Sequence, residues 1–267
     1  MASYHIVQTL LVTFVIPNCN ASHLECYNGW DNVYSFGPHT MIYTNQYVEV
    51  SFTVFIFCRM ELIMTISYRL ASKLYLNITN TCPCACVFCL RETQSGVGDA
   101  ASLWLEREPE PEEIKAALNA CYPFDGMDEI VFCGYGEPMA RADVVVEICQ
   151  YVKDIFAKNG RAALPIRINT NGLVYLMCPG FDASTLAAVD TVSISLNADD
   201  PAEYLRVARP RFGEQSFDAL LDFARDAREY TDVVFSVVEG TMSDQRLENC
   251  MRIAQELGVS FRLRPRE

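Results

Sequence analysis

Three cysteines in one short segment, Cys82, Cys86 and Cys89, have the residue type and the spacing to hold a metal cluster. Thiolates are the preferred protein ligands of iron–sulfur clusters, and they also bind zinc. Three thiolates at C-x3-C-x2-C spacing can hold three irons of a [4Fe–4S] cluster and leave the fourth iron open to a substrate or cosubstrate. The spacing therefore predicts a reactive cluster, with a structural zinc site or a simple electron-transfer cluster as the alternative.

Cys84 lies inside the same segment, and we do not count it as a ligand. A zinc site would need it as the fourth ligand, and the alternating run from Cys82 to Cys86 is a cramped geometry for a tetrahedral ion. The cysteines after residue 89 are dispersed among apolar neighbours, which is typical of reduced core residues. We therefore predict no second cluster and no disulfide framework, and we expect a cytoplasmic protein.

Histidine is missing from the part of the chain that carries these motifs. His5, His23 and His39 all precede Met64. This distribution argues against histidine-based acid–base catalysis, a Ser-His-Asp triad and a histidine-ligated hydrolytic metal. Redox or radical chemistry is the class that is left.

Apolar strands and amphipathic helices alternate after Met64. Repeated β-α units of this kind predict an α/β fold with a parallel sheet, either a partial (β/α)6 TIM barrel or an open doubly wound sheet. Strands are predicted over 73–78, 129–133, 166–169, 191–196, 233–238 and 260–263. Helices are predicted over 111–120, 143–158, 184–189, 217–230 and 245–257.

Polar residues follow four of these strands, at the end of a parallel sheet where functional residues gather. The first strand leads into the cysteine segment. The second leads into Gly134, Tyr135, Gly136 and Glu137, where glycines allow close backbone approach and the carboxylate can receive a cationic amine. The next two end in Asn169 to Gly172 and in Ser195 and Asn197, whose groups suit hydroxyl recognition. For Asn171-Gly172 a turn is the better interpretation.

Residues 1–63 differ from the rest of the chain. They contain no lysine, one arginine (Arg59) and four acidic residues, and they are rich in β-branched and aromatic residues. We expect an N-terminal extension with Met64 as the true start, followed by a catalytic domain over 64–267; a small β-rich subdomain is the alternative. The apolar run from Ile6 to Ile16 lacks a basic flank and is too short to span a bilayer, so no membrane association is expected.

The net charge of −13 argues against a general nucleic-acid-binding surface, because phosphate contacts need clustered cations. Two local arginine clusters stand out as either basic pockets or solvated rims. They are Arg206, Arg209 and Arg211, and Arg262, Arg264 and Arg266.

The chain after Met64 resembles the radical SAM enzymes and, more narrowly, the TatD-associated radical SAM family. The resemblance rests on 75–80, on the cysteine segment running into Leu90-Arg91, on 131–138, on 167–172, and on 193–198 followed by Tyr204 and Arg209-Pro210. It implies the partial barrel. Glycyl-radical-enzyme activases carry acidic and lysine residues where this chain has Asn169 and Ser195-Leu196-Asn197, which weakens an activase assignment. Deazaguanine-forming relatives stay open.

The resemblance also implies a cofactor set. Cys82, Cys86 and Cys89 would hold a [4Fe–4S] cluster, and S-adenosyl-L-methionine would bind its open iron. Reduction would give a 5′-deoxyadenosyl radical that takes hydrogen from an unidentified substrate, with a flavodoxin- or ferredoxin-like protein as the electron donor. The residues expected around the cosubstrate are Phe88, Gly134, Tyr135, Gly136, Glu137, Asn169, Ser195, Asn197 and Arg209.

Overall fold

The computed structural model describes residues 5–17, 34–43, 47–58, 64–94 and 96–265. The chain divides into two units, Met1–Ile63 and Met64–Glu267. In the first unit, strands β1 (His5–Pro17), β2 (Tyr34–Tyr43) and β3 (Tyr47–Cys58) form an antiparallel sheet in the order β1-β3-β2. The start at Met64 remains a prediction, and Arg266 lies outside the described residues.

The second unit is built on a seven-stranded sheet whose strands follow one another in chain order, β4 to β10. β4 (Ser67–Leu70) is antiparallel to β5 (Lys73–Leu76), and every later strand is parallel to its predecessor. The later strands are β6 (Glu129–Phe132), β7 (Ile166–Thr170), β8 (Thr191–Ser195), β9 (Asp232–Val238) and β10 (Ser260–Arg264).

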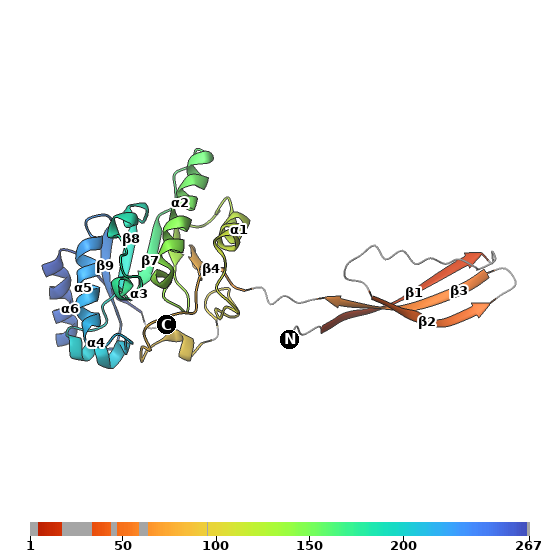
Figure 1. The fold of residues 1–267 in the computed structure, drawn as a ribbon, viewed down its shortest axis with the longest axis horizontal. Helices are drawn as coiled ribbons and strands as arrows, with labels where there is room; N and C mark the ends of the chain where they lie inside the picture. The colour runs from red at the N-terminus through yellow and green to blue at the C-terminus, as the bar shows by residue number, and fades with distance from the viewer. Residues whose placement is uncertain (1–4, 18–33, 44–46, 59–63, 95, 266–267) are drawn as a thin grey trace. The chain divides into compact units, whose positions relative to one another are not determined.

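This strand order decides between the two architectures that the sequence leaves open. A doubly wound sheet reverses its strand order at a switch point, whereas a barrel adds each strand beside the last. The six parallel strands here run without reversal, so the fold is a partial (β/α)6 barrel. Figure 1 shows β7, β8 and β9 side by side, with helices packed along the sheet.

Helices connect the parallel strands. They are α1 (Pro111–Cys121), α2 (Ala142–Lys158), α3 (Val174–Met177), α4 (Pro201–Ala208), α5 (Gln215–Ala227) and α6 (Asp244–Leu257), with short 3-10 turns at Leu90–Glu92, Pro138–Arg141 and Ala183–Ala188. Three of these helices, α1, α2 and α6, were predicted within one residue, and α5 begins two residues and ends three residues before its predicted bounds. The sequence prediction missed α3, α4 and β4, and its helix over 184–189 is a 3-10 turn.

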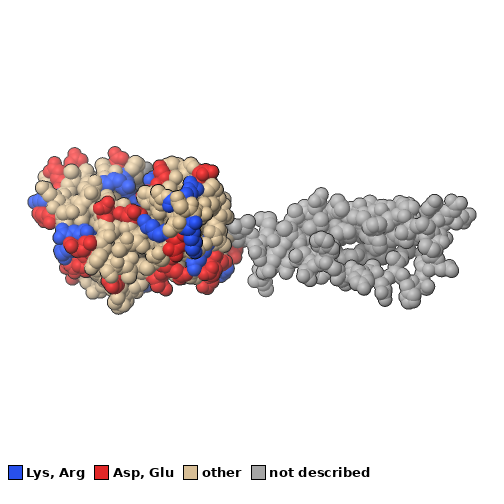
Figure 2. All heavy atoms as spheres, turned by 90° about the horizontal axis from the view of Figure 1, so that it is seen from above, with Lys and Arg blue, Asp and Glu red and all other residues tan. Residues whose placement is uncertain are grey.

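The two faces of the sheet differ in chemistry because successive strand residues point to opposite sides. One face packs against the helices in the apolar core, with Leu74 and Leu76 of β5, Ile130 and Phe132 of β6, and their counterparts on β7 to β9. The inner face instead carries polar and charged side chains, among them Glu129 and Arg167, which pair at 2.9 Å. The outer surface seen in Figure 2 has acidic and basic side chains interspersed.

Candidate active site

A cavity of about 280 Å³ lies where the parallel strands end, at the edge of the sheet that carries active sites in barrels. It gathers nearly all of the residues selected from the sequence. Those that line it are Cys82, Cys86, Phe88, Cys89, Gly134, Tyr135, Gly136, Glu137, Asn169, Ser195 and Asn197. The segments that follow β5, β6, β7 and β8 therefore contribute to one site, as the parallel topology predicts.

Arg209 is the exception. It ends α4 in the left-handed conformation with φ of 48°, its side chain is exposed, and it does not line the cavity. Its backbone carbonyl lies 3.4 Å from the amide nitrogen of Ala85. The structure thus places Arg209 behind the cysteine segment, where its main chain and not its guanidinium makes the contact.

The cysteine segment is held by main-chain hydrogen bonds to the end of α4. The amides of Ala85 and Val87 donate to the carbonyls of Ala208 and Val207 at 3.1 and 2.9 Å. The amide of Arg211 donates to the carbonyl of Pro83 at 2.9 Å, and the amide of Glu137 donates to Thr81 at 2.8 Å. These bonds fix the path of the segment from both sides, so the thiols are presented to the cavity by backbone that is already ordered.

The thiols of this segment influence one another. Cys84 is buried, and hydrogen bonds to Cys82 and Cys86, together with burial, raise the pKa of its thiol. The hydrogen bond between Cys84 and Cys82 lowers the pKa of Cys82 to about 6, and the one between Cys84 and Cys86 lowers the pKa of Cys86; the charge of Arg91 assists both shifts. Burial raises the pKa of Cys89. The described residues contain no group of three Cys, His, Asp or Glu side chains arranged around a single metal ion.

Gly134 and Gly136 are required by packing between loops. A Cβ on Gly136 would lie 2.2 Å from the carbonyl oxygen of Thr79, and one on Gly134 would lie 2.0 Å from Oδ1 of Asn77. In both cases the added Cβ would collide with the segment that follows β5. The glycines therefore let the loop after β6 approach the residues that lead into the cysteines, a different reason from the ligand approach that the sequence suggested.

Glu137 is buried and joins two strand ends. Its Oε2 accepts the amide hydrogen of Asn171 at 2.7 Å, and its Oε1 accepts that of Met139 at 3.0 Å. Burial, followed by the negative charge of Cys82, raises the pKa of Glu137 to about 8, and the backbone amides oppose this shift. Glu137 is thus both part of the cavity wall and a fixed link from β6 to β7.

Two asparagines present unsatisfied polar atoms at the cavity. Asn171 closes a turn by accepting the amide hydrogen of Leu173 at 2.9 Å, as predicted, but its buried Nδ2 has no hydrogen-bond partner within the geometric limits among the described residues. Oδ1 of Asn197 is also buried, and it has no hydrogen-bond partner in the part of the chain that the structure describes. Because a buried polar atom without a partner is costly, these atoms fit a site that is completed by a polar ligand. Asn169 is engaged by Arg167 at 2.6 Å.

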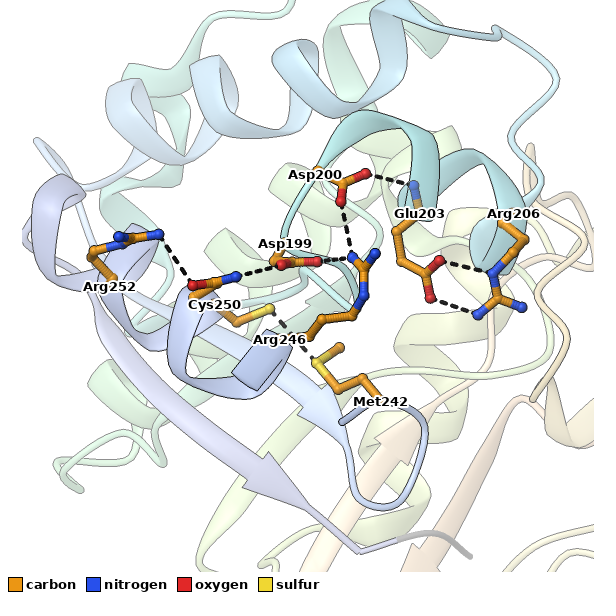
Figure 3. Close-up of polar contacts among 9 residues, drawn as sticks. Asp199, Asp200, Glu203, Arg206, Met242, Arg246, Cys250 and Arg252 are labelled. Carbon is orange, nitrogen blue, oxygen red and sulfur yellow. Dashed lines mark hydrogen bonds and ion pairs between the residues drawn. The ribbon is translucent and has the colours of Figure 1, made fainter. Parts of the chain in front are cut away.

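A network of ion pairs holds the loop that follows Asn197 (Figure 3). Arg246 of α6 lies between Asp199 and Asp200, and its Nη1 is 2.9 Å from Oδ2 of Asp200. Asn249 donates to Asp199 at 2.7 Å. Asp200 also caps α4 by accepting the amide hydrogen of Glu203 at 2.8 Å. α6 thereby fixes the start of α4, whose other end holds the cysteine segment.

Several cavity residues were not selected from the sequence. Cys133 and Asn171 line the cavity, and so does Arg264, the last residue of β10. Asn171 had a detectable signal, since it ends a strand beside the other clusters, but its Asn-Gly pair favours a turn. Arg264 appeared only as part of a basic cluster, because nothing local distinguishes an inward arginine from one on a solvated rim.

The family model that describes the Radical SAM superfamily matches residues 76–254, which span both the cysteine segment and all the loops of the cavity except the end of β10. The chain belongs to the radical SAM superfamily. This membership supports a radical SAM enzyme over the zinc or electron-transfer module considered above. Membership implies an iron–sulfur cluster and S-adenosylmethionine.

Solved structures share the fold of this radical SAM enzyme. They include Streptococcus suis SuiB bound to precursor peptide SuiA (TM-score 0.55, 15% identity, 74% of this chain and 40% of that one). They also include anSMEcpe with bound AdoMet, with a TM-score of 0.53 and 12% identity over 72% of this chain and 50% of that one. A third is TYW1 with a lysine-pyruvate adduct bound, with a TM-score of 0.50 and 15% identity over 78% of this chain and 68% of that one. The chain thus spans half or less of the length of SuiB and anSMEcpe. No curated protein matches.

The residues present fit the implied cofactors. Three half-buried thiols and a pair of unsatisfied amide atoms border one cavity, which provides soft ligands for iron beside polar groups for an organic cosubstrate. No helix in the described part of the chain is long and apolar enough to cross a membrane.

Proposed function

We propose that this radical SAM enzyme holds a [4Fe–4S] cluster on Cys82, Cys86 and Cys89 and cleaves S-adenosylmethionine at the open iron. The observation that carries the proposal is the convergence of these three thiols with Glu137 and Asn197 on one cavity. These groups, when bound, would supply one-electron cleavage of the bond between sulfur and C5′ of S-adenosylmethionine, which would give methionine and a 5′-deoxyadenosyl radical able to take a hydrogen atom from the substrate.

Residues of this chain would orient the cosubstrate. The main chain of Gly134 to Glu137 faces the cavity beside the cysteines and would meet the amino group. Ser195 and Asn197 would bind ribose hydroxyls, for which the buried Oδ1 of Asn197 is a suitable acceptor. Phe88 is half-buried between the cysteines and would pack beside the cluster or the adenine.

Tyr135, Cys84 and Asn169 would shape this site without binding iron. Tyr135 is buried at the cavity, and its hydroxyl donates to the carbonyl of Gln94. The main chain of Cys84 forms an isolated antiparallel β-bridge with that of Pro210, which helps to anchor the cysteine segment. Asn169 is positioned by Arg167. These contacts support roles in water exclusion and rigidity.

The assignment to a subfamily within the radical SAM superfamily rests on the sequence motifs alone. Gly-Tyr-Gly-Glu-Pro at 134–138 and Ser-Leu-Asn at 195–197 favour the TatD-associated radical SAM family. We propose a cytoplasmic enzyme over residues 64–267, reduced by a flavodoxin- or ferredoxin-like donor, with residues 1–63 as an extension. Mass spectrometry of the native N-terminus tests the extension, since a peptide from before Met64 would overturn a start at that residue.

Anaerobic reconstitution tests the chemistry. The full chain is loaded with iron and sulfide, S-adenosylmethionine and dithionite are added, and 5′-deoxyadenosine is measured by chromatography. Cys82→Ala, Cys86→Ala and Cys89→Ala should each abolish the product, whereas the matched Cys84→Ala variant should keep it. No product from native protein with a full load of iron and sulfide would reject the proposal.

A further inference from the structure

The inner face of the seven-stranded sheet carries more cations than its carboxylates balance. Strand alternation places Lys73, Arg167, Arg262 and Arg264 on this face, on the side opposite the core residues of the same strands. Its central carboxylate is Glu129. Asp232 shares the face but begins β9, and is exposed at the opposite end of the sheet from Arg264. The excess of positive charge is notable in a chain whose net charge is −13.

Glu129 is fully engaged by the two cations nearest to it. Arg167 donates to both of its oxygens, Nε to Oε1 and Nη2 to Oε2, each at 2.9 Å. Lys73 forms an ion pair with the same carboxylate. The paired fork of Arg167 and the added ammonium satisfy the acceptor positions of Glu129, so this group has little capacity left for a third cation.

Arg262 and Arg264 of β10 have no carboxylate partner among the described residues. Nη2 of Arg262 donates to the hydroxyl of Ser193 at 3.1 Å, a neutral partner. Arg262 and Arg264 lie two residues apart and so share one face of β10. Burial and the charges of Arg167 and Arg264 lower the pKa of Arg262. Charged groups held together in this way are stabilised when an anion neutralises them.

Arg264 borders the cavity and carries an unsatisfied donor. Its Nε is buried without a hydrogen-bond partner in the part of the chain that the structure describes, and its side chain is half-buried. Arg264 ends β10, the last of the parallel strands, whereas the cysteine segment follows β5, the first of them. The unpaired guanidinium and the thiols therefore enter the same cavity from different strands.

We propose that Arg264, supported by Arg262, binds an oxyanion of the substrate, a carboxylate or a phosphate. This inference rests on the proposed function for its assignment to a substrate. The oxyanion would accept hydrogen bonds from the guanidinium and would neutralise the pair of arginines. The methionine carboxylate of S-adenosylmethionine has the same chemistry, and the test below separates the two sources.

The first arm is calorimetric titration of the full chain, without cluster, with two probes, succinate and inorganic phosphate. At least one probe should bind saturably, and Arg264→Gln should weaken that binding at least tenfold. Arg264→Lys should restore part of it, because lysine keeps the charge but loses the paired donors. Arg252→Gln is the control, since Arg252 is an exposed arginine on α6. Absence of saturable binding, or equal affinity in native protein and Arg264→Gln, overturns the proposal.

If circular dichroism shows that Arg264→Gln does not fold, the same calorimetric titration is made with Arg264→Lys and Arg262→Gln instead. Weaker binding in both supports the site, and native affinity in both rejects it. Because this arm needs neither iron nor cosubstrate, its result is independent of whether the radical chemistry occurs.

The second arm measures binding of S-adenosylmethionine to reconstituted protein by equilibrium dialysis. Equal affinity in native protein and Arg264→Gln, with the probe still bound at saturating S-adenosylmethionine, supports a substrate site. Tenfold weaker binding of S-adenosylmethionine together with displacement of the probe identifies the methionine carboxylate as the occupant and overturns the substrate assignment. If the probe binds through Arg264 but the protein makes no 5′-deoxyadenosine, the anion site is supported and the proposed function is rejected.

Discussion

Oε2 of Glu137 accepts the amide hydrogen of Asn171 at 2.7 Å, which joins the loop after β6 to the loop after β7. Its other oxygen accepts the amide hydrogen of Met139. One buried side chain therefore satisfies two main-chain donors that no strand partner reaches, at the edge of the cavity where the chain changes direction twice.

Replacing this carboxylate should lower stability. Glu137→Gln keeps one acceptor oxygen but turns an amide NH₂ toward one of the two backbone donors, which leaves that donor unsatisfied. The free energy of unfolding should fall by about 1–3 kcal/mol. Guanidinium unfolding followed by circular dichroism measures it. An unchanged midpoint and slope would show that the two amides find other acceptors.

Loss of the N-cap of α4 should loosen the cysteine segment. Asp200→Ala removes the acceptor for the amide of Glu203 and a partner of Arg246, at a cost of about 1 kcal/mol or more. Because α4 holds Ala85 and Val87 by their amides, hydrogen exchange at these two positions should accelerate.

Asp182→Ala is the matched control for this effect. Asp182 also accepts an amide hydrogen, from Ser184 at 2.9 Å, but it caps a 3-10 turn that leads into the start of β8, at the end of the sheet opposite the cavity. Its loss should leave exchange at Ala85 and Val87 unchanged. Equal acceleration in both variants would point to general destabilisation instead of transmission through α4.

Gly136→Ala should destabilise the protein more than alanine at an open glycine. The new methyl group would lie 2.2 Å from the carbonyl of Thr79, and backbone cannot move aside as a side chain can. Overpacking of this kind costs about 1–3 kcal/mol. Gly126→Ala, where nothing lies within 4 Å of the Cβ but φ is +74°, reports the cost of backbone strain alone. Equal midpoints in the two variants would contradict the packing argument.

Two buried thiols should make the protein sensitive to alkaline pH. Burial raises the pKa of Cys149 and of Cys250 to about 12, from an ordinary value of 9.0. The folded state keeps these protons where the unfolded chain releases them, so their stabilisation is complete below pH 9 and declines as pH rises toward 12. The decline should approach about 1.4 kcal/mol per thiol for each pH unit.

Denaturant titrations at intervals from pH 8 upward measure this decline. A Cys149→Ala, Cys250→Ala variant should start from a lower stability because of lost packing, and should lose less stability with rising pH than the native chain. Parallel curves for the two proteins would show that other groups control the alkaline transition.

Local sequence patterns predicted the parallel strands well because each is a run of apolar, β-branched residues ending in polar ones. β7 and β9 were placed within a residue of their observed bounds. β4 was missed because the turn that joins it to β5 contains no glycine and instead places Ala71 at φ of 52°. α4 could have been found, since Asp200-Pro201 is a strong N-terminal capping pair.

The site was predictable to the extent that parallel topology carries strand ends to one edge. The grouping of the cysteines with Glu137 and Asn197 follows from that rule, and the resemblance named the chemistry. The inward position of Arg264 does not follow, because it depends on how far the sheet curls and on which face of β10 meets the cavity. Strand order among distant segments is likewise a property of long-range packing, which no local pattern encodes.

The main-chain anchoring of the cysteine segment makes its outer positions available for engineering. Val87 is 49% exposed, and its amide donates to the carbonyl of Val207, so every residue except proline can keep this bond at its place. A nitrile-bearing aromatic residue at position 87, directly after Cys86, would be an infrared reporter whose frequency follows charge changes beside the thiols. If the proposed function is right, this reporter would follow reduction of the cluster in real time.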